Sequence, residues 1–334
     1  MGDVTGVPGR PHFVIAGAPK AGTTALHAAL ATHPALHLSP VKEPKFYLCD
    51  GRPPRRADHR GPGDAHSRRE WVWRAEAYRR LFADAPPGAV RGESTPFYLH
   101  DRDALPRLAA DVPDVRVVAV VRDPVDRALS NWRHLRADGL EPEADFLAAV
   151  RREDERAAAG WAPFWRYRGL GRYGEQVQRL LGVLPAEQVH VLRYRDLVDT
   201  PTAALDAVCT FLGVPTGVAH TVPAANSKPV VGDGLRHRLL SRAVRAGAAV
   251  GSLAPPQVWR RASRPLLAAL HARPVPPAPL PVEVRREVLA PLLEDVDLLE
   301  RLTGLEVDSW RGDAGRGDFR SRAAGRPASA PDRP

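Results

Sequence analysis

Cysteine, methionine and lysine are all scarce in this chain of 334 residues, which holds 2 Cys, 1 Met and 4 Lys. Cys49 and Cys209 are too few for a disulfide framework and lack the close spacing of metal ligands, which argues against a disulfide-stapled secreted domain and against a cysteine zinc site. The 12 histidines are also scattered without ligand spacing. We therefore expect a reducing compartment and no metal site.

Long apolar runs are missing too, and aromatic residues are few. No run reaches the roughly 18 apolar residues of a membrane span, and the N-terminus is polar, so we expect neither an anchor nor a signal peptide and predict a cytoplasmic protein. The 48 basic residues are dispersed among 39 acidic ones, and aromatic residues make up only 6%. This pattern argues against a nucleic-acid partner.

The apolar content, 44%, is sufficient for one large core, and we expect a single domain over residues 11–310. Residues 1–10 are predicted to be a flexible N-terminus. Residues 52–69, rich in Arg, Pro, Gly and His, are predicted to form an exposed loop. From residue 311 the chain is mostly Gly, Arg, Ser, Ala and Pro, so 311–334 is predicted to be a disordered tail.

Strand and helix patterns alternate along this domain. Near-continuous β-branching predicts a buried strand over 115–121, and shorter apolar runs predict strands at 12–17, 89–92 and 188–192. Helices are predicted at 24–32, 70–82, 125–136, 146–158, 173–181 and 203–212. The alternation predicts an α/β fold, a parallel sheet of the P-loop type with helices on both faces.

A glycine-containing turn joins the first strand to the first helix. Gly17 and Gly22 keep the spacing of the nucleotide-hydrolase loop G-x-x-x-x-G-K-[ST], but its lysine position is Thr23 and the lysine comes earlier, at Lys20. Backbone amides and the helix dipole make such a turn an anion cradle. Lysines survive elsewhere only at 42, 45 and 228, where 44 other basic residues are arginine, which suggests roles that arginine does not fill.

The strongest strand ends at Arg122, where a magnesium-dependent phosphotransferase would be expected to place a carboxylate. Asp123, before Pro124, is interpreted as a helix cap. Arg122 and Ser130 instead suit a second anion. The two sites together indicate a nucleotide that carries an additional phosphate.

These two segments resemble the motifs of the PAPS-dependent sulfotransferases, whose donor is 3'-phosphoadenosine-5'-phosphosulfate. Residues 19–24 are similar to the 5'-phosphosulfate loop of that family, and residues 121–130 to its 3'-phosphate motif. The resemblance implies that Lys20 stabilises the leaving group and that Ala21, Gly22, Thr23 and Thr24 hold the 5'-phosphate. It further implies 3'-phosphate contacts from Arg122 and Ser130. The remaining implied donor contacts are Tyr173 and, for closure over the nucleotide, Lys228 or Arg236.

Residues 41–47 resemble the carbohydrate (heparan-type) branch, in which the position of Glu43 is the presumed general base and Lys45 assists at the sulfate. Residues 92–98 also resemble that branch, with Ser94 in place of its usual lysine. The branch's C-terminal Lys-Gly-Arg element and its disulfide are missing, and bacterial small-molecule sulfotransferases look closer overall. The implied acceptor is a hydroxyl or amine of a natural product, lipid or glycan. Neither its identity nor the oligomeric state follows from the sequence.

The sequence also allows other functions and other residue roles. A P-loop kinase or NTPase would use Asp123 to bind Mg²⁺, and a catalytically silent nucleotide-binding protein would keep the loop without turnover. Glu43 could instead pair with Lys42 or Lys45, in which case His100 or His134 becomes the candidate base. Lys45 could instead face solvent, and Tyr173 could be a core aromatic. Trp161, Trp165 and Tyr167 form either an acceptor platform or part of the core.

Overall fold

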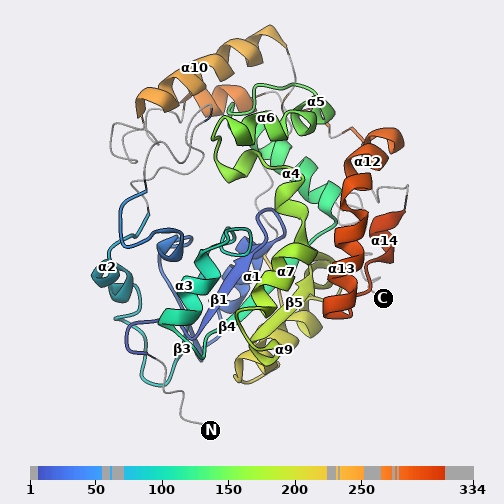
Figure 1. The fold of residues 1–334 in the computed structure, drawn as a ribbon. Helices are drawn as coiled ribbons and strands as arrows, with labels where there is room; N and C mark the ends of the chain where they lie inside the picture. Colours follow the sequence, from blue (N-terminus) through green and yellow to red (C-terminus); the bar gives the residue numbers. More distant parts are fainter. Residues whose placement is uncertain are drawn as a thin grey trace, which may run out of the picture.

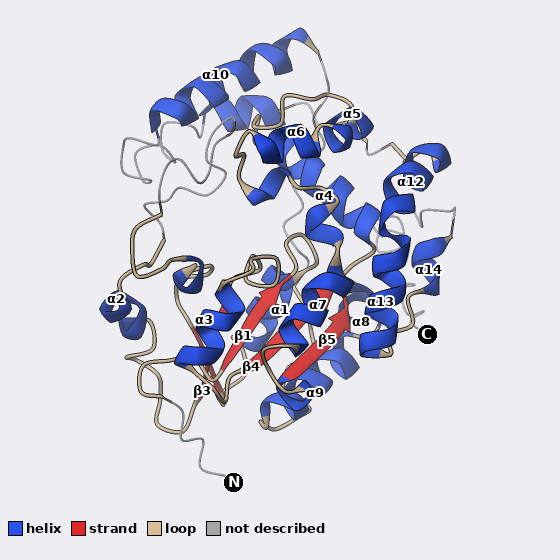
Figure 2. Cartoon of the chain, in the orientation of Figure 1, coloured by secondary structure: helices blue, strands red, loops and turns tan. Residues whose placement is uncertain are grey.

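The computed structural model describes residues 7–54, 61, 71–223, 231, 234–251, 265–272, 275–276 and 278–312. Five parallel strands form one sheet in the order β2-β3-β1-β4-β5. The strands are β1 (Phe13–Gly17), β2 (Leu36–Leu38), β3 (Val90–Ser94), β4 (Arg116–Val121) and β5 (Val189–Arg193). The predicted parallel α/β fold is therefore confirmed, with helices packed on both sides of the sheet (Figures 1 and 2).

The first half of the chain contributes helices α1 (Thr23–Leu30), α2 (Ala75–Arg80), α3 (Ala104–Asp111), α4 (Pro124–Ala137), α5 (Phe146–Arg151) and α6 (Glu153–Ala158). The second half contributes α7 (Tyr173–Leu181), α8 (Tyr194–Asp199), α9 (Pro201–Leu212), α10 (Leu235–Gly251), α12 (Val282–Leu289), α13 (Leu293–Thr303) and α14 (Asp308–Arg311). Short 3₁₀ helices cover Phe46–Leu48, Pro163–Trp165, Gly169–Gly171, Ala186–Gln188 and Ala290–Leu292.

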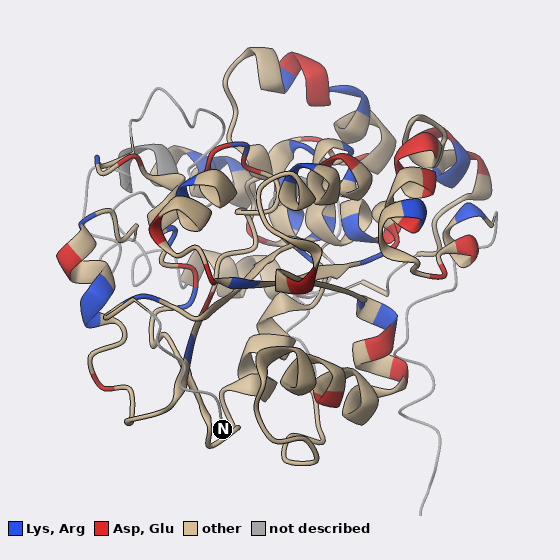
Figure 3. Ribbon diagram, turned by 60° about the horizontal axis from the view of Figure 1, so that its bottom comes forward, with Lys and Arg blue, Asp and Glu red and all other residues tan. Residues whose placement is uncertain are grey.

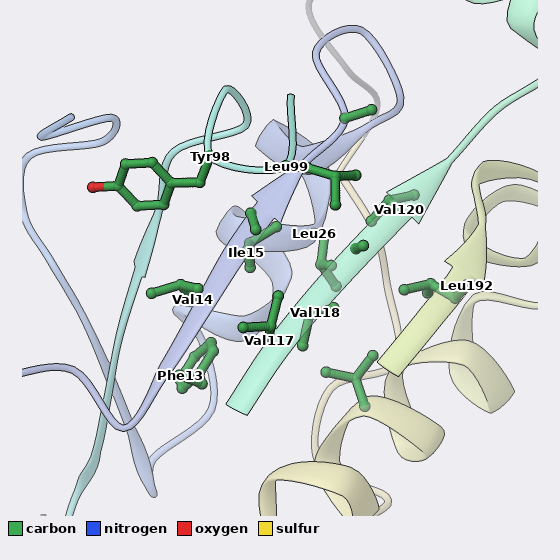
Figure 4. Close-up of a cluster of buried hydrophobic side chains, with 14 of the residues drawn as sticks. Phe13, Val14, Ile15, Leu26, Tyr98, Leu99, Val117, Val118, Val120 and Leu192 are labelled. Atoms are coloured by element: carbon green, nitrogen blue, oxygen red, sulfur yellow. The ribbon is translucent and has the colours of Figure 1, made fainter. Parts of the chain in front are cut away.

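The central strands are buried on both faces, as their β-branched sequence predicts. Every residue of β1 is buried, and Val117 to Val121 of β4 have no exposed surface. Figure 4 shows these side chains packed beside Leu26 of α1 and Leu192 of β5. The core thus fixes the relative positions of β1 and β4, whose carboxyl ends carry the two predicted anion sites.

Two expected helices differ in the structure, and one strand of the sheet was not expected. The helix predicted at 70–82 covers only Ala75–Arg80, because the Val72 amide donates to the Pro44 carbonyl at 2.9 Å instead of entering a helix. The helix predicted at 146–158 is broken at Arg152 into α5 and α6. The edge strand β2 was not predicted at all. Its three residues are too short to show a periodic pattern.

The ends of the chain are described only in part. Residues 1–6 and 313–334, and most of the loop predicted at 52–69, lie outside the described residues. Arg311, where the tail was predicted to begin, is the last residue of α14.

No helix within the described ranges is long and apolar enough to cross a membrane. Lys/Arg and Asp/Glu positions are interspersed along the helices (Figure 3).

Candidate active site

The turn between β1 and α1 has the geometry of an anion cradle. Gly22 stands at the helix N-cap with φ of 94°, and its carbonyl accepts from the amides of Ala25 at 3.0 Å and Leu26 at 3.1 Å. As the first residues of a helix, Thr23 and Thr24 have no earlier carbonyl to bond, so their amides are available at the positive end of the helix dipole. The predicted 5'-phosphate loop therefore has backbone donors where a phosphate would need them.

Gly22 is required by its surroundings as well as by its φ. A Cβ at this position would come 2.6 Å from Cδ2 of Tyr194, the first residue of α8. The same tyrosine ring lies 4.8 Å from the guanidinium carbon of Arg122. Arg122 also donates to the Lys20 carbonyl at 3.4 Å. The loop after β1 and the end of β4 are thus joined around one aromatic ring.

The end of β4 confirms the interpretation of Asp123 as a helix cap. Its Oδ1 accepts from the amides of Val125 at 2.9 Å and Asp126 at 3.0 Å at the start of α4. Its carboxylate is also paired with the buried guanidinium of Arg285 from α12. Ser130 lies two turns along α4, half-buried, on the helix that begins at this cap.

Lys20 is held in a left-handed conformation, with φ of 69°. Its Nζ lies 3.2 Å from Nδ1 of His134 on α4. On the other side of that ring, Nε2 of His134 is 3.5 Å from Oδ2 of Asp138. The structure therefore brings His134, until now only an alternative candidate for the general base, next to Lys20, which is predicted to stabilise the leaving group.

Glu43 and Lys45 also have left-handed backbones, each with φ of 60°. The Glu43 amide donates to the Ser94 carbonyl at 2.9 Å, and its Oε1 accepts from Lys42 Nζ at 2.8 Å. The Lys45 side chain is 4% exposed and lies over the Trp71 ring, with Nζ 5.2 Å from its centroid. The pairing of Glu43 with Lys42 is thus present, whereas Lys45 does not face solvent.

Ser94 occupies the position of the lysine that is usual in the carbohydrate branch. It is fully buried, and its Oγ lies 2.8 Å from Nδ1 of His27 on α1. Burial, with the positive charge of Lys42 as a second cause, lowers the pKa of His27 to about 4, so this imidazole is neutral at physiological pH. The neutral pair of Ser94 and His27 therefore stands where the carbohydrate branch usually has a positively charged lysine.

Glu93, the residue before Ser94 in β3, was not among the residues predicted from sequence. It has no exposed surface and accepts hydrogen bonds from Tyr98 at 2.7 Å, Thr95 at 2.8 Å and Tyr78 at 3.0 Å. Burial raises the pKa of Glu93 to about 7 against the opposing effect of these donors, and the charge of Glu43 adds to the rise. A glutamate at the end of a buried strand was the available signal, since an acidic side chain is rarely placed in a core without a specific role.

The aromatic candidates are mostly core residues. Trp165 and Tyr167 are buried, so the core interpretation is correct for both, and Trp161 packs against Trp165 at the margin of the same cluster. Tyr173 has no exposed surface and packs against Trp310. Burial raises the pKa of its phenol, and the charges of Arg127 and Asp123 also act on it. Tyr173 is therefore a core aromatic beside the end of β4, and a contact with the nucleotide stays a prediction.

Lys228 and Arg236 were predicted to close over the nucleotide, and their side chains lie outside the described part of the structure. Lys228 lies outside the described residues, and Arg236 falls within α10, in a part whose side chains are not described. His100, the other substitute base, has a pKa lowered to about 4 by burial, with the charges of Arg166 and Arg179 adding to the effect. Within the described ranges there is no cluster of three or more potential metal ligands.

A sequence model of the sulfotransferase family matches residues 11–217, which is more than half of the chain and includes both anion sites. The chain belongs to the sulfotransferase family. The C-terminal segment that contains Arg285 lies outside the matched residues. The sulfotransferase motifs and the fold are thus confirmed together, while the individual residue roles remain predictions.

Curated relatives agree with this assignment. The chain is 29% identical over 216 residues to the bifunctional heparan sulfate N-deacetylase/N-sulfotransferase 3 of Mus musculus, covering 61% of this chain and 22% of that protein. It is 28% identical over 205 residues to the mouse heparan sulfate glucosamine 3-O-sulfotransferase 3B1, covering 61% of this chain and 46% of that protein. The chain therefore spans less than half the length of these relatives.

A crystal structure of a sulfotransferase from Alicyclobacillus acidocaldarius matches this chain over nearly the whole length of both. It is 28% identical, with a TM-score of 0.68, and the match covers 91% of this chain and 99% of that chain. The similarity to a bacterial sulfotransferase extends well beyond residue 217. The C-terminal helices thus have counterparts in at least one other member of the family.

Proposed function

We propose that the protein transfers a sulfuryl group from 3'-phosphoadenosine-5'-phosphosulfate to a hydroxyl or amine of a small-molecule, lipid or glycan acceptor. Membership of the sulfotransferase family supports the reaction class. Two neighbouring anion sites, at the ends of β1 and β4, support a donor that carries phosphate groups at two positions. Switch points at the carboxyl ends of parallel strands are where such folds bind their ligands.

The observation that carries the proposal is a shared backbone conformation. Among the described residues, Lys20, Glu43 and Lys45 are the non-glycine residues with positive φ. Non-glycine residues in this region cost free energy, and they are retained where the surrounding structure enforces them, commonly at active sites. The three strained residues are the same three that were predicted for catalysis from sequence. Lys20 follows β1, and the segment after β2 that holds Glu43 and Lys45 is hydrogen-bonded to the carboxyl end of β3, the neighbour of β1.

The residues present fit the donor. The first-turn amides of α1 and the hydroxyls of Thr23 and Thr24 suit the 5'-phosphate, and the guanidinium of Arg122 with the Ser130 hydroxyl suits the 3'-phosphate. When bound, this donor supplies an activated sulfuryl group on a phosphosulfate bridge. Ala21 lies in the same turn, fully buried, where its small side chain allows close approach of the backbone.

The transfer step requires a proton acceptor and a stabilised leaving group. In the proposed roles, the Glu43 carboxylate takes the proton of the acceptor as its oxygen or nitrogen forms a bond to sulfur. The bond between sulfur and the bridging oxygen breaks, and the Lys20 ammonium stabilises the negative charge that develops on that oxygen. Lys45 adds positive charge near the sulfate oxygens. Because Lys20 supplies this charge, we propose that turnover does not depend on added metal.

His134 fits the role of a residue that orients Lys20. For a charged Lys20 to donate to Nδ1, that nitrogen must be unprotonated, which leaves Nε2–H directed at Asp138. The same tautomer leaves His134 without a free basic nitrogen. This favours Glu43 over His134 as the general base.

The kinase reading receives less support. It requires the Asp123 carboxylate to bind Mg²⁺, but that carboxylate caps α4 and pairs with Arg285. Ligation of a metal by Asp123 would compete with its ion pair to the buried Arg285 and with its capping hydrogen bonds.

Calorimetry and turnover test the proposal. The desulfated donor, 3'-phosphoadenosine 5'-phosphate, should bind more tightly than ATP, GTP or AMP, with or without Mg²⁺. Incubation of the labelled donor with alcohol, phenol and amine acceptors should give a labelled product in the presence of EDTA. Tightest binding of ATP with Mg²⁺ would instead support the kinase, and donor binding without turnover on any acceptor would support the silent binder.

A further inference from the structure

We propose that Glu93 is a positioning residue, which holds the backbone segment of Glu43 and Lys45 in its strained conformation through two bridging hydroxyl groups. The kinetic consequence rests on the proposed function. The structural consequence, ordering of residues 43–48, does not. Glu93 lies at the end of β3, directly beneath this segment.

Two of the three hydroxyls that donate to Glu93 also accept a hydrogen bond from the segment. The Lys45 amide donates to Oγ1 of Thr95 at 3.3 Å, and Thr95 donates to Oε2 of Glu93 at 2.8 Å. The Tyr47 amide donates to the Tyr98 hydroxyl at 3.3 Å, which in turn donates to Oε1 at 2.7 Å. Each bridging hydroxyl is both donor and acceptor, and hydrogen bonds linked in this way strengthen one another.

The third hydroxyl provides a natural comparison. Tyr78 on α2 donates to the same Oε1 of Glu93 at 3.0 Å but accepts no amide hydrogen bond from residues 43–48. Its ring stacks on Phe46 with a centroid distance of 4.2 Å, a contact that phenylalanine would keep. Tyr78 therefore contributes to the environment of the carboxylate without bridging it to the segment.

The network depends on the ionised form of Glu93. A carboxylate accepts all three hydroxyl donors, whereas a protonated acid must use one oxygen as a donor and loses at least one of them. Burial raises the pKa of Tyr78 and of Tyr98 well above the usual range of phenols, so both remain neutral donors. Because burial raises the pKa of Glu93 to about 7, the network should loosen as the pH falls below neutrality. The titratable groups that face Glu93 are Tyr78 from α2, Tyr98 after β3, Tyr47 from the 3₁₀ helix and Glu43.

The strain explains why such an anchor is needed. Glu43 and Lys45 each have φ of 60°, and Lys45 is the N-cap of the 3₁₀ helix Phe46–Leu48 without a side-chain cap. Left-handed conformations at two positions in three residues cost about 2–4 kcal/mol in total. Fixed hydrogen bonds to the amides of Lys45 and Tyr47 offset this cost. Without them, the segment would relax, and the Glu43 carboxylate would no longer be held toward the acceptor.

Four single variants of the full chain separate bridging from general packing: Glu93→Gln, Thr95→Val, Tyr98→Phe and Tyr78→Phe. Hydrogen exchange of residues 43–48 is measured at pH 8.5, where Glu93 is ionised. The first three variants should exchange about two- to tenfold faster, the equivalent of one net hydrogen bond, and Tyr78→Phe should exchange like the wild type. In the wild type, exchange corrected for its intrinsic pH dependence should be slower at pH 8.5 than at pH 6, and in Glu93→Gln this difference should vanish.

The kinetic arm uses the same variants with the full donor. The three bridging variants should lower kcat and leave the affinity for the desulfated donor unchanged, since the network lies under the acceptor side. Unchanged exchange in Thr95→Val and Tyr98→Phe, or equal acceleration in Tyr78→Phe, would overturn the proposal. If Glu93→Gln fails to fold, these hydroxyl variants decide the matter. If no acceptor gives turnover, the proposed function fails while the exchange measurements still test Glu93.

Discussion

At the scale of single residues, the proposed mechanism assigns the leaving group to a lysine and the acceptor to a carboxylate on a different segment. Lys20 follows β1 and contacts His134, whereas Glu43 is tied to the end of β3 through its own amide. The two strands are neighbours, with Ile15 opposite Ser94. Substitutions of Lys20 and Glu43 should therefore have different kinetic signatures.

Replacing Lys20 by alanine should remove stabilisation that is realised mainly in the transition state. We expect kcat to fall about 10²–10³-fold, with a much smaller loss of affinity for the desulfated donor, because the ammonium interacts most strongly as charge develops. Steady-state kinetics and calorimetry on the same preparation measure both effects. A fall in kcat/KM matched by an equal fall in donor affinity would reduce Lys20 to a binding residue.

Replacing Glu43 by glutamine keeps its shape and removes the proton acceptor. With an alcohol acceptor, kcat should fall about 10²–10⁴-fold while donor affinity is retained. Lys42→Met is the matched control, since Lys42 is the ion-pair partner of Glu43. Similar modest losses in both variants would mean that the ion pair alone matters. Normal turnover in Glu43→Gln would direct attention to His134.

At the scale of elements, the turn between β1 and α1 depends on the absence of a side chain at Gly22. Gly22→Ala introduces a strained φ and a contact with the Tyr194 ring. Gly88→Ala is the control, because Gly88 has φ of 77° but no atom within 4 Å of the added Cβ. Both variants should lose about 1 kcal/mol of stability from strain. Only Gly22→Ala should also lose donor affinity, measured by calorimetry. Equal donor affinity in the two would show that the Tyr194 contact is unimportant.

The C-terminal helices support the second anion site from outside the segment that matches the family. Arg285 of α12 pairs with Asp123, the cap of α4, and also donates to the carbonyls of Trp310 and Gly312. Asp295 of α13 accepts from the amides of Gly174 at 2.9 Å and Glu175 at 2.8 Å at the start of α7. These contacts connect α12 and α13 to the helices that bear Ser130 and Tyr173.

Arg285→Met should therefore destabilise the fold by about 3–5 kcal/mol, because Asp123 would remain as a charge without its buried partner. In the double variant with Asp123→Asn, the asparagine still accepts the capping amides and the unpaired charge is gone, so much of the loss should be recovered. Urea unfolding of the two single variants and the double variant measures the coupling. Strictly additive losses would show that the two side chains act independently.

At the scale of the whole molecule, stability should depend on pH through buried groups of opposite sign. Burial lowers the pKa of His12, His27 and His100 to about 4, so their contribution to stability is lost as the pH falls from 6.5 toward 4. The raised pKa of Glu93 has the reverse effect. Its contribution is full below the ordinary value of 4.5 and is lost as the pH rises through about 7.

Comparison of the wild type with Glu93→Gln isolates the effect of Glu93 on the pH dependence of stability. The difference in unfolding free energy, variant minus wild type, should increase by about 3 kcal/mol between pH 4.5 and 7.5 and be flat outside that range. Urea unfolding at several pH values measures it. Parallel profiles would mean that Glu93 titrates alike in the folded and unfolded chains. The ionised form that orders residues 43–48 is thus the less stable one, a cost that functional sites commonly carry.

Much of the fold could be predicted from sequence because its signals are local. The β-branched run at 115–121 corresponds to β4, the pattern at 173–181 to α7, and the shifted lysine loop to the turn before α1. Such patterns reflect the burial of one segment, which side-chain type alone reports. The start of α2 could not be predicted, because the hydrogen bond from Val72 to Pro44 joins it to a distant segment. The break between α5 and α6 has no local signal in the sequence.

For the candidate site, the sequence by itself placed Lys20 and Arg122 after predicted strands, and its resemblance to the carbohydrate branch of the family predicted Glu43 and Lys45. Only the tertiary structure decided their partners. His134 is 114 residues from Lys20, and Arg285 is 162 residues from Asp123. No local pattern records such pairs. The role inferred for Glu93 likewise depends on burial and on three hydroxyls gathered from α2 and the segment after β3, an environment that exists only once the chain has folded.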